Sequence, residues 1–430
     1  MVFENTIEFA TNMDEKDPLH AFQKKFFIPP FQDGKSIYFC GNSLGLQSIS
    51  AGETVKKTLD EWAQLGIEGF FDGDENWANL PERIALQLSA IVGAFPEEVM
   101  VANALTVNLH LLMTSFYQPT PERFKILIEG GAFPSDQYAV DSQVKWHGYL
   151  PEEAVIEIFP EGGKKLIDEN QIKAAINQHA DSLALVLIGG VNYFTGQVFN
   201  LHKIARWTHE VGAIFGVDLA HSIGNIPLTL HDWDVDFAVW CHYKYLNGGP
   251  GAPGGYFVHQ NHHQKSFKRL EGWWGNNASN RFLMRRNFTP AEGAAAWQLS
   301  TPSAISLAPL LASLTIFEEA GMHKIREKSI LLTGYLRFLL EQMPNFQQKF
   351  QIITPSNTEE TGAQLSIYIK ENGGELFEYL TKHGVILDWR EDNLNPDSIG
   401  SGVIRIAPNP LYNSFTEIFR FSKILSKWHS

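Results

Sequence analysis

Two deficits in this sequence exclude whole classes of protein. Cysteine is scarce, because the 430 residues include only Cys40 and Cys241, which lie far apart. So sparse a pair makes no disulfide framework and is typical of a reducing compartment. Basic charge is also in deficit: 34 Lys and Arg stand against 48 Asp and Glu, which leaves a formal net charge of −14. Nucleic acids and anionic membranes are recognised by basic surfaces, so we expect no nucleic-acid partner and no membrane partner.

Targeting and membrane segments are missing from the sequence as well. The first residues, Met1–Thr6, are polar and acidic, with neither the basic start nor the apolar run of a signal peptide. The longest apolar run, Leu183–Val191, is too short to span a bilayer. We therefore expect a cytoplasmic protein.

Several familiar motifs are absent or match by letters alone. The chain has no Gly-x-Ser-x-Gly elbow and no His-Glu-x-x-His helix, which removes the common hydrolase signatures. Residues Gly249–Gly254 spell a dinucleotide fingerprint, but they contain two prolines and do not open a helix, so no such site is predicted. His259, His262 and His263 lie in a polar stretch that no acid or cysteine joins at ligand spacing, so a solvated loop and no metal site are expected.

What the sequence does contain is enough apolar residue for a large core. Apolar residues make up 44% of the chain and charged residues 19%, and the length exceeds what one core usually supports. We predict an α/β protein with a large domain and a smaller α+β domain. The expected division is residues 1–70 as an N-terminal arm and part of the small domain, 71–300 as the large domain, and 301–430 as the small domain.

The large domain is predicted from an alternation of apolar strands and amphipathic helices. Continuous apolar strands that alternate with helices indicate a mostly parallel sheet covered by helices on both faces. The expected strands are 125–128, 154–158, 183–188, 213–217, 237–241 and 256–259, and the expected helices are 107–116, 135–146, 168–179 and 202–211.

The flanking regions have a different character. Residues 1–30 show little periodicity and are expected to form an irregular arm. Ser50–Glu53 is a possible capping box for a helix that Gly66 ends, and Thr301 is a possible N-cap before Pro302. Helices are then expected up to Gly321, over 323–343 and over 415–428, with strands at 363–369, 385–387 and 403–406, and an exposed polar loop at 391–402.

The stretch around Lys244 carries the clearest chemistry. An apolar strand delivers a lysine between Tyr243 and Tyr245, where loss of water could lower the amine pKa and make it a nucleophile or base. Upstream, another strand ends at Asp218. A lysine that forms a Schiff base and an aspartate that pairs with the pyridinium nitrogen are the minimum set of residues for a pyridoxal 5′-phosphate (PLP) enzyme. The two residues alone leave the alternative open that Lys244 is a snorkelling surface lysine and Asp218 a helix cap.

The position of other polar residues favours the enzyme interpretation. In a parallel sheet, ligands gather at the carboxyl ends of the strands. Pairs of distinctive residues follow four predicted strands there: Phe133 and Asp136, Asn192 and Tyr193, Asp218 and His221, and Tyr243 and Lys244.

A phosphate group also needs an anion site. Leu105 and Thr106 open the predicted helix 107–116, where free backbone N–H groups and the threonine hydroxyl could hold a phosphate. The alternative is that Thr106 is only an N-cap.

These stretches together resemble the kynureninase family of PLP enzymes, which have the fold type I, aspartate-aminotransferase-like architecture. The resemblance spans nearly the whole chain in the family's order. It rests on the stretches Tyr38–Gln47, Asn103–Met113, Phe133–Asp136, Tyr193–Gln197, Asp218–Asn225, Tyr243–Asn247, Gly272–Gly275 and Arg405–Asn413.

The resemblance implies roles for residues at matching positions. Lys244 would form the Schiff base, Asp218 would pair with the pyridinium nitrogen, and with Tyr243 they would be the catalytic residues. Phe133 would stack on the cofactor ring. The other implied cofactor contacts are Leu105, Thr106, Asp136 and His221, with Trp273 and Thr301 supplied across a dimer interface; Ser43 and Arg405 would bind the substrate, the arginine clamping its carboxylate.

The resemblance also implies an activity. A kynureninase hydrolyses the β,γ carbon–carbon bond of L-kynurenine or 3-hydroxykynurenine to anthranilate or 3-hydroxyanthranilate and L-alanine, in tryptophan catabolism and NAD biosynthesis, as a homodimer. Three positions depart from the family: Gly189 replaces a usual serine, His242 a serine or threonine, and Phe70 and Phe71 stand where a pocket histidine is usual. Two alternatives stay open: another fold type I enzyme (β-lyase, desulfurase or class V aminotransferase), or a non-catalytic binding protein.

Overall fold

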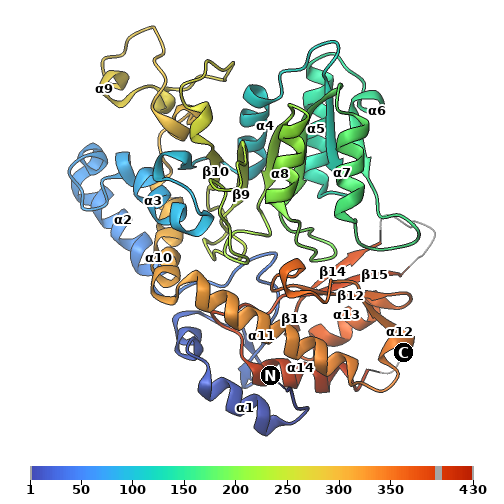
Figure 1. Ribbon diagram of the computed structural model, residues 1–430. Coiled ribbons are helices and arrows are strands. Elements are labelled where there is room, and N and C mark those ends of the chain that lie inside the picture. The colour runs from blue at the N-terminus through green and yellow to red at the C-terminus, as the bar shows by residue number, and fades with distance from the viewer. Residues whose placement is uncertain (1, 393–399, 429–430) are drawn as a thin grey trace.

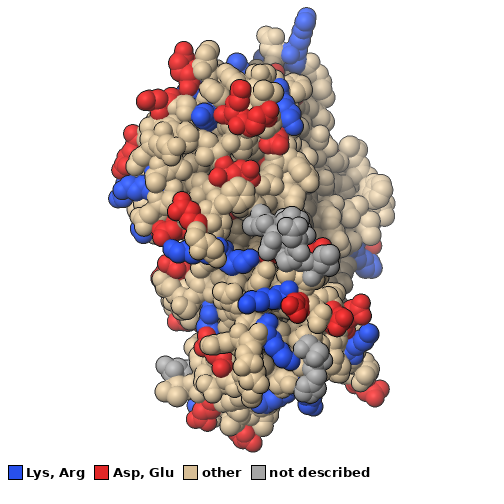
Figure 2. All heavy atoms as spheres, turned by 90° about the vertical axis from the view of Figure 1, so that its right-hand side faces the viewer, with Lys and Arg blue, Asp and Glu red and all other residues tan. Residues whose placement is uncertain are grey.

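The computed structural model describes residues 2–392 and 400–428. Figure 1 shows two units, one built on a larger sheet and one on a smaller sheet, with both chain ends at the smaller unit. On the face that Figure 2 presents, acidic and basic side chains are interspersed among the described residues and do not gather into one large basic patch.

The larger unit is organised around a seven-stranded sheet of order β4-β10-β9-β8-β7-β5-β6. The strands, in sheet order, are Val99–Val101, Gly254–Val258, Phe237–Cys241, Ile214–Asp218, Leu183–Gly189, Lys125–Glu129 and Val155–Ile158. The run from β9 to β6 is parallel, and β10 is antiparallel to both of its neighbours. The predicted α/β class with a mostly parallel sheet is confirmed, with a mixed edge that the pattern of apolar runs did not reveal.

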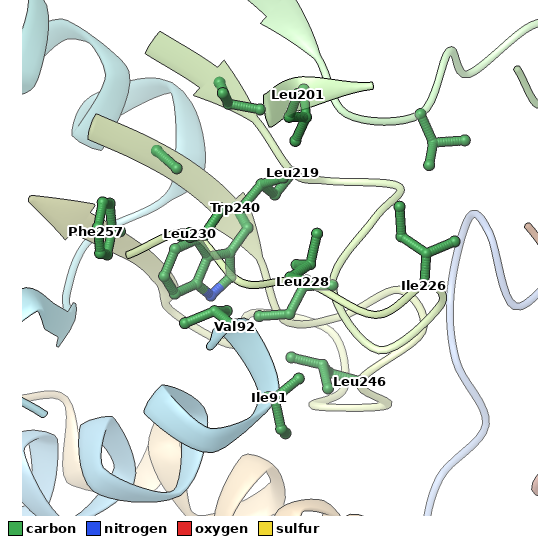
Figure 3. Close-up of a cluster of buried hydrophobic side chains, with 14 of the residues drawn as sticks. Ile91, Val92, Leu201, Leu219, Ile226, Leu228, Leu230, Trp240, Leu246 and Phe257 are labelled. Atoms are coloured by element: carbon green, nitrogen blue, oxygen red, sulfur yellow. The ribbon is translucent and has the colours of Figure 1, made fainter. Parts of the chain in front are cut away.

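Helices cover both faces of this sheet, which explains why its strands are apolar throughout. In β7, Leu185 and Leu187 share a buried cluster with residues of α4 and α5, whereas Val186 and Ile188 share another with residues of α7 and α8. The second cluster continues around Trp240, beside Val92 of α3 (Figure 3). These helices are α3 (Leu80–Val92), α4 (Leu105–Phe116), α5 (Pro134–Trp146), α7 (Glu169–Gln178) and α8 (Leu201–Glu210).

The smaller unit is the predicted α+β region. Its four-stranded antiparallel sheet has the order β11-β12-β15-β14, and the two-residue strand β13 pairs in parallel with β3 from the N-terminal part. The strands are β3 (Ile37–Tyr38), β11 (Phe350–Ile352), β12 (Leu365–Ile369), β13 (Val385–Ile386), β14 (Asp388–Glu391) and β15 (Gly402–Ile406). The helices are α1 (Ile7–Lys16), α11 (Met322–Glu341), α12 (Phe346–Lys349), α13 (Gly373–Lys382) and α14 (Phe415–Leu425).

Two helices lie where the units meet. Helix α2 (Ala51–Leu65) packs against α10 (Ala304–Ala320), and Leu310 and Leu314 of α10 are buried in the core of the larger unit. The division of the chain near residues 70 and 300 stays a prediction, and this packing leads us to propose a boundary after α10, at Gly321.

The N-terminal arm is more regular than expected. Helix α1 forms there, capped by Thr6, whose hydroxyl accepts a hydrogen bond from Phe9 N at 3.1 Å. Ala10 and Asp14 of this helix are buried. The Asp14 carboxylate accepts a hydrogen bond from Phe415 N at 2.6 Å, at the start of α14. Phe9, Ala10 and Met13 of α1 pack in the core of the smaller unit, so the helix does have a short apolar face, which the sequence reasoning overlooked.

Two expected helix caps are wrong. Ser50 does precede α2, but its backbone is already αR and its side chain makes no capping bond, so no capping box forms. Helix α10 begins at Ala304 after Ser303, so Thr301 lies two residues before the N-cap position and does not cap the helix. Gly66, with φ 56°, ends α2 as predicted. Most of the expected loop 391–402 lies outside the described residues.

Within residues 2–392 and 400–428, no single helix has the length and hydropathy needed to cross a membrane. Helices α10 and α11 have that length and hydropathy only when taken together, and the chain bends by 82° between them.

Candidate functional site

A small cavity lies at the carboxyl ends of β5, β7, β8 and β9, where the strand order places four chain segments at one edge of the sheet. The starts of α4 and α5 close its other side. Eight of the predicted site residues line it: Leu105, Thr106, Phe133, Asp136, Asp218, His221, Tyr243 and Lys244. The structure therefore brings together most of a set that is scattered over 140 positions of sequence.

Lys244 lines this cavity and is buried, with 9% of its surface exposed. Its Nζ lies 2.9 Å from His221 Nε2, 5.7 Å from the centre of the Phe133 ring and 5.9 Å from that of Tyr243. Burial, together with the nearby lysine charge, holds the pKa of His221 well below its ordinary value. The imidazole is therefore neutral and accepts a hydrogen bond from the ammonium group, which leaves its Nδ1 without a partner among the described residues.

Two aspartates face Lys244 from neighbouring elements. Asp218 ends β8, and its Oδ1 accepts a hydrogen bond from Ala220 N at 2.6 Å. Burial raises the pKa of Asp218, and burial plus the neighbouring Asp218 carboxylate raises that of Asp136 well above its usual value. A cationic ring nitrogen would relieve this cost by pairing with the Asp218 carboxylate, so the acidic pair fits a pyridinium group.

An anion cradle lies beside the aspartates. Helix α4 begins at Leu105 after Ala104, which has no side chain to cap the first N–H groups, so Thr106 is not the N-cap. The hydroxyls of Thr106 and Ser135 meet at 2.6 Å, from the first turns of α4 and α5. Uncapped N–H groups, two helix N-termini and two hydroxyls are suited to a phosphate dianion.

Ser43 and Arg405 meet next to this cavity, although neither lines it. Arg405 is 2% exposed on β15; its Nη1 donates to Tyr193 O at 2.9 Å and its Nη2 to Ser43 Oγ at 3.1 Å and to the Asp388 carboxylate. Its Nε is a buried donor without a partner in the described chain. The Tyr193 ring packs edge-on against Phe133 at 5.3 Å, so a carboxylate clamp directly borders the cavity.

Trp273 and Thr301 do not line the cavity of the chain to which they belong. Trp273 is 44% exposed and packs edge-on against Phe282 at 5.6 Å, while Thr301 is exposed before α10. Their contact with a cofactor across a dimer interface stays a prediction.

Several lining and neighbouring residues escaped the sequence reasoning. Ser135 lies inside the quoted stretch Phe133–Asp136, and Glu129 directly follows the predicted strand 125–128, so the strand-end rule could have found both. Asp388 carried no such signal, because only the pairing of β14 with β15 places it opposite Arg405.

The three departures from the family have different consequences here. A Cβ on Gly189 would lie 2.8 Å from Glu129 Oε1, so glycine leaves room for that carboxylate. His242 accepts from Trp240 Nε1 at 2.8 Å and donates to Pro253 O at 2.6 Å; burial lowers its pKa to about 4, so it is a satisfied core residue. Phe70 packs edge-on against Trp77 at 5.4 Å.

Of the histidines expected in a solvated loop, His259 and His262 are buried and lie beside acids, which corrects that expectation. His262 Nε2 lies 2.6 Å from Asp236, and His259 comes near Glu98 and His231, whose ligand atoms lie within 4.8 Å of one another. Residues distant in sequence supply these acids, which is why spacing did not show them. Glu98 already accepts hydrogen bonds from His231 Nδ1 and from a backbone N–H, which accounts for this group without a metal.

The chain is similar in sequence to known kynureninases. Residues 325–425 match the family model for the kynureninase C-terminal domain. The kynureninases of Flavobacterium psychrophilum and Flavobacterium johnsoniae are each 49% identical to the chain over 429 residues, with 99% of both chains covered.

Solved structures with the same fold are more distant. A mutant of the lyase C-DES with glycine covalently linked to its PLP cofactor has a TM-score of 0.76 at 16% identity, covering 92% of this chain and 97% of its own. The cysteine desulfurase CsdA of Escherichia coli has a TM-score of 0.76 at 15% identity, covering 94% and 97%. They support the architecture alone, whereas identity along the full length settles the family: the chain belongs to the kynureninase family.

Proposed function

We propose that this protein is a PLP-dependent hydrolase that cleaves the β,γ carbon–carbon bond of L-kynurenine, 3-hydroxykynurenine or both. The products are anthranilate or 3-hydroxyanthranilate and L-alanine. The observation that carries the proposal is the shared cavity of Lys244 and Asp218, bordered by the Arg405 clamp, in a chain of this family. When bound, PLP supplies an electron-withdrawing ring that stabilises negative charge on the substrate's α-carbon.

The chain's own residues would hold the cofactor at three points. The start of α4 with Thr106 and Ser135 would bind the phosphate. Phe133 would pack against one face of the ring. Asp218 would hold the proton on the ring nitrogen, which a carboxylate does best in a buried site of this kind.

Other residues would bind the substrate and move protons. Arg405 and Ser43 would receive the α-carboxylate, since the guanidinium keeps an unused Nε donor. The Lys244 amine, once released to act as a base, would take the α-proton. Burial raises the pKa of Tyr243, so its phenol keeps the proton and can donate a hydrogen bond beside the lysine.

We further propose that the enzyme acts as a cytoplasmic homodimer in the breakdown of tryptophan through kynurenine. Large apolar side chains are exposed around Trp273, and Phe71 packs edge-on against Phe282 among them at 5.5 Å. Exposed apolar patches of this kind support association. The ring contacts join Phe71, Phe282 and Trp273, and further exposed apolar residues lie close to them in sequence: Ile67, Leu283 and Met284.

Other activities on the same fold have less support. A desulfurase needs a reactive thiolate, yet burial raises the pKa of Cys40 to about 11 and also raises that of Cys241, which lies within β9. A β-lyase or aminotransferase would share the cofactor contacts but would release products other than anthranilate. A non-catalytic binding protein would have no need for a buried lysine and aspartate in one cavity.

The direct test is turnover of L-kynurenine and 3-hydroxykynurenine by the purified protein with PLP, followed by product fluorescence. We expect anthranilate or its 3-hydroxy derivative together with equimolar alanine, and we expect Lys244→Ala to lower kcat by at least roughly 10³-fold. Lys203→Ala, on the exposed face of α8, is the matched control and should keep full activity. No anthranilate from a PLP-loaded protein would overturn the proposal, and full activity of Lys244→Ala would overturn the mechanism.

A further inference from the structure

Glu129 is a buried carboxylate in the cavity that the roles above leave unused. It is the last residue of β5 and only 6% exposed. Its Oε2 accepts a hydrogen bond from Asn192 Nδ2 at 2.9 Å, and its Oε1 accepts a longer one from Gly189 N at 3.3 Å. Among the described residues, Glu129 has no ion pair with a lysine or arginine to offset its burial.

The Asn192 side chain is held in a single orientation by its own turn. Its Oδ1 accepts three hydrogen bonds, from Phe194 N at 3.0 Å, Thr195 N at 2.8 Å and Thr195 Oγ1 at 3.0 Å. With the oxygen committed to those donors, the amide nitrogen must point toward Glu129. The carboxylate therefore fixes the turn 192–195 to the end of β5.

That turn carries a carbonyl that the substrate clamp uses. Tyr193 O accepts from Arg405 Nη1 at 2.9 Å and from Gln364 Nε2 at 3.0 Å. A continuous hydrogen-bonded path thus runs from Glu129 in the larger unit, through the turn, to the guanidinium of Arg405 on β15 in the smaller unit.

The neighbouring strands show why the carboxylate can lie here. Strands β5, β7 and β8 are adjacent, and Gly189 of β7 pairs with Asp218 of β8. Glycine at this position leaves the space that Glu129 Oε1 occupies, because a Cβ would lie 2.8 Å from that oxygen. Burial raises the pKa of Glu129 to about 7, and the nearby Asp218 adds to that rise.

We propose that Glu129 is a positioning residue for the substrate's carboxylate: through Asn192 it fixes the Tyr193 carbonyl and thereby the Arg405 guanidinium. The inference rests on the proposed function for the role of Arg405 and deepens it. It predicts that loss of Glu129 weakens the binding of ligands that have an α-carboxylate and leaves matched ligands without one unaffected.

The test compares L-alanine with L-alaninamide, which lacks the carboxylate, by titration calorimetry on the PLP-loaded protein. In Glu129→Ala, the buried Asn192 amide loses its acceptor, so we expect Kd for L-alanine to rise about tenfold or more and Kd for L-alaninamide to change less than about twofold. In Glu129→Gln, the side-chain amide oxygen can still accept from Asn192, so we expect Kd for L-alanine to stay within about threefold.

Two further variants keep the test decisive. Asn192→Ala breaks the same path one step later and should reproduce the ligand discrimination of Glu129→Ala, including the case in which the latter does not fold. Glu157→Ala, on the neighbouring strand β6, is the control and should leave both ligands unaffected.

Equal weakening of both ligands, or unchanged binding of L-alanine in Glu129→Ala and Asn192→Ala, would overturn the inference. Calorimetry needs no turnover, so a protein that failed to cleave kynurenine would contradict the proposed function while these Kd values still decided the role of Glu129.

Discussion

The two ends of the proposed site, the cavity around Lys244 and the exposed surface around Trp273, differ in how far a single chain completes them. The cofactor end is lined by residues of one chain, which buries Lys244 and places Asp218 in the same cavity. At the other end, Trp273 and Phe71 stand exposed in an apolar patch away from the cavity of their own chain. The comparison teaches that one folded chain brings together most of the predicted cofactor contacts, whereas the contacts of Trp273 and Thr301 across a dimer interface stay a proposal.

The largest expected effect lies at the enclosed end. In Asp218→Asn the ring nitrogen loses its anionic partner without a change of shape, and we expect kcat to fall roughly 10³-fold. Asp141→Asn on α5, outside the cavity, is the control. Steady-state kinetics on kynurenine measures the effect, and a loss below tenfold would show that Asp136 serves the nitrogen equally well.

The exposed end is tested by breaking the patch. We expect the double variant Ile67→Asp and Leu283→Asp to sediment as a monomer and to lose roughly 10²-fold in kcat/KM, because charges in an apolar interface are poorly tolerated. Leu150→Asp places the same charge on another exposed leucine and should leave both properties unchanged. A variant that became monomeric but remained fully active would show that the site is complete in one chain.

A third prediction sharpens the electrostatic side of the comparison. The pKa of Glu129 is about 7 in the folded state, against 4.5 as its ordinary value. The folded state therefore binds the extra proton between these values, so Glu129 lowers stability progressively as pH rises from 4.5 to 7. In the cofactor-free protein, the stability of Glu129→Gln relative to the parent should increase across that window by roughly 2–3 kcal/mol.

Thermal and denaturant unfolding at pH 4.5, 6 and 8 measure this difference. Glu157→Gln, an exposed neighbour on β6, should show no comparable trend. A stability difference that stayed constant with pH would mean that Glu129 titrates at its ordinary value in the folded protein.

The smallest expected effect is at Gly189. In Gly189→Ala the new Cβ meets Glu129 Oε1 at 2.8 Å, and the end of that flexible side chain must move. We expect a rise of about three- to tenfold in KM with little change in kcat, because the shift reaches the clamp and leaves Lys244 in place. Gly374→Ala, where a Cβ meets no atom within 4 Å, is the control. A fall in kcat at unchanged KM would contradict the proposed route to Arg405.

Most of the large sheet and most of the residues that line the cavity could be predicted from the sequence. Apolar runs predicted six of the seven strands of the large sheet and missed the short edge strand β4, because strands buried on both faces must be apolar throughout. The strand-end rule then gathered Phe133, Asp136, Asp218 and Lys244, since parallel strands expose their carboxyl ends at one edge. These are local signals, and each needs only a short window of sequence.

What only the tertiary structure decided are the contacts between segments far apart in the chain. Asp388 and Arg405 meet because the register of β14 and β15 places them opposite each other. Glu129 is linked to Arg405 through the turn 192–195, which follows β7. The buried Asp14 carboxylate of α1 likewise accepts from the first N–H groups of a helix about 400 residues away. Hydrogen bonds between distant segments produce no periodic pattern in the sequence. Which residues pair is decided by how the segments pack in three dimensions, and the spacing of residues along the chain does not predict it.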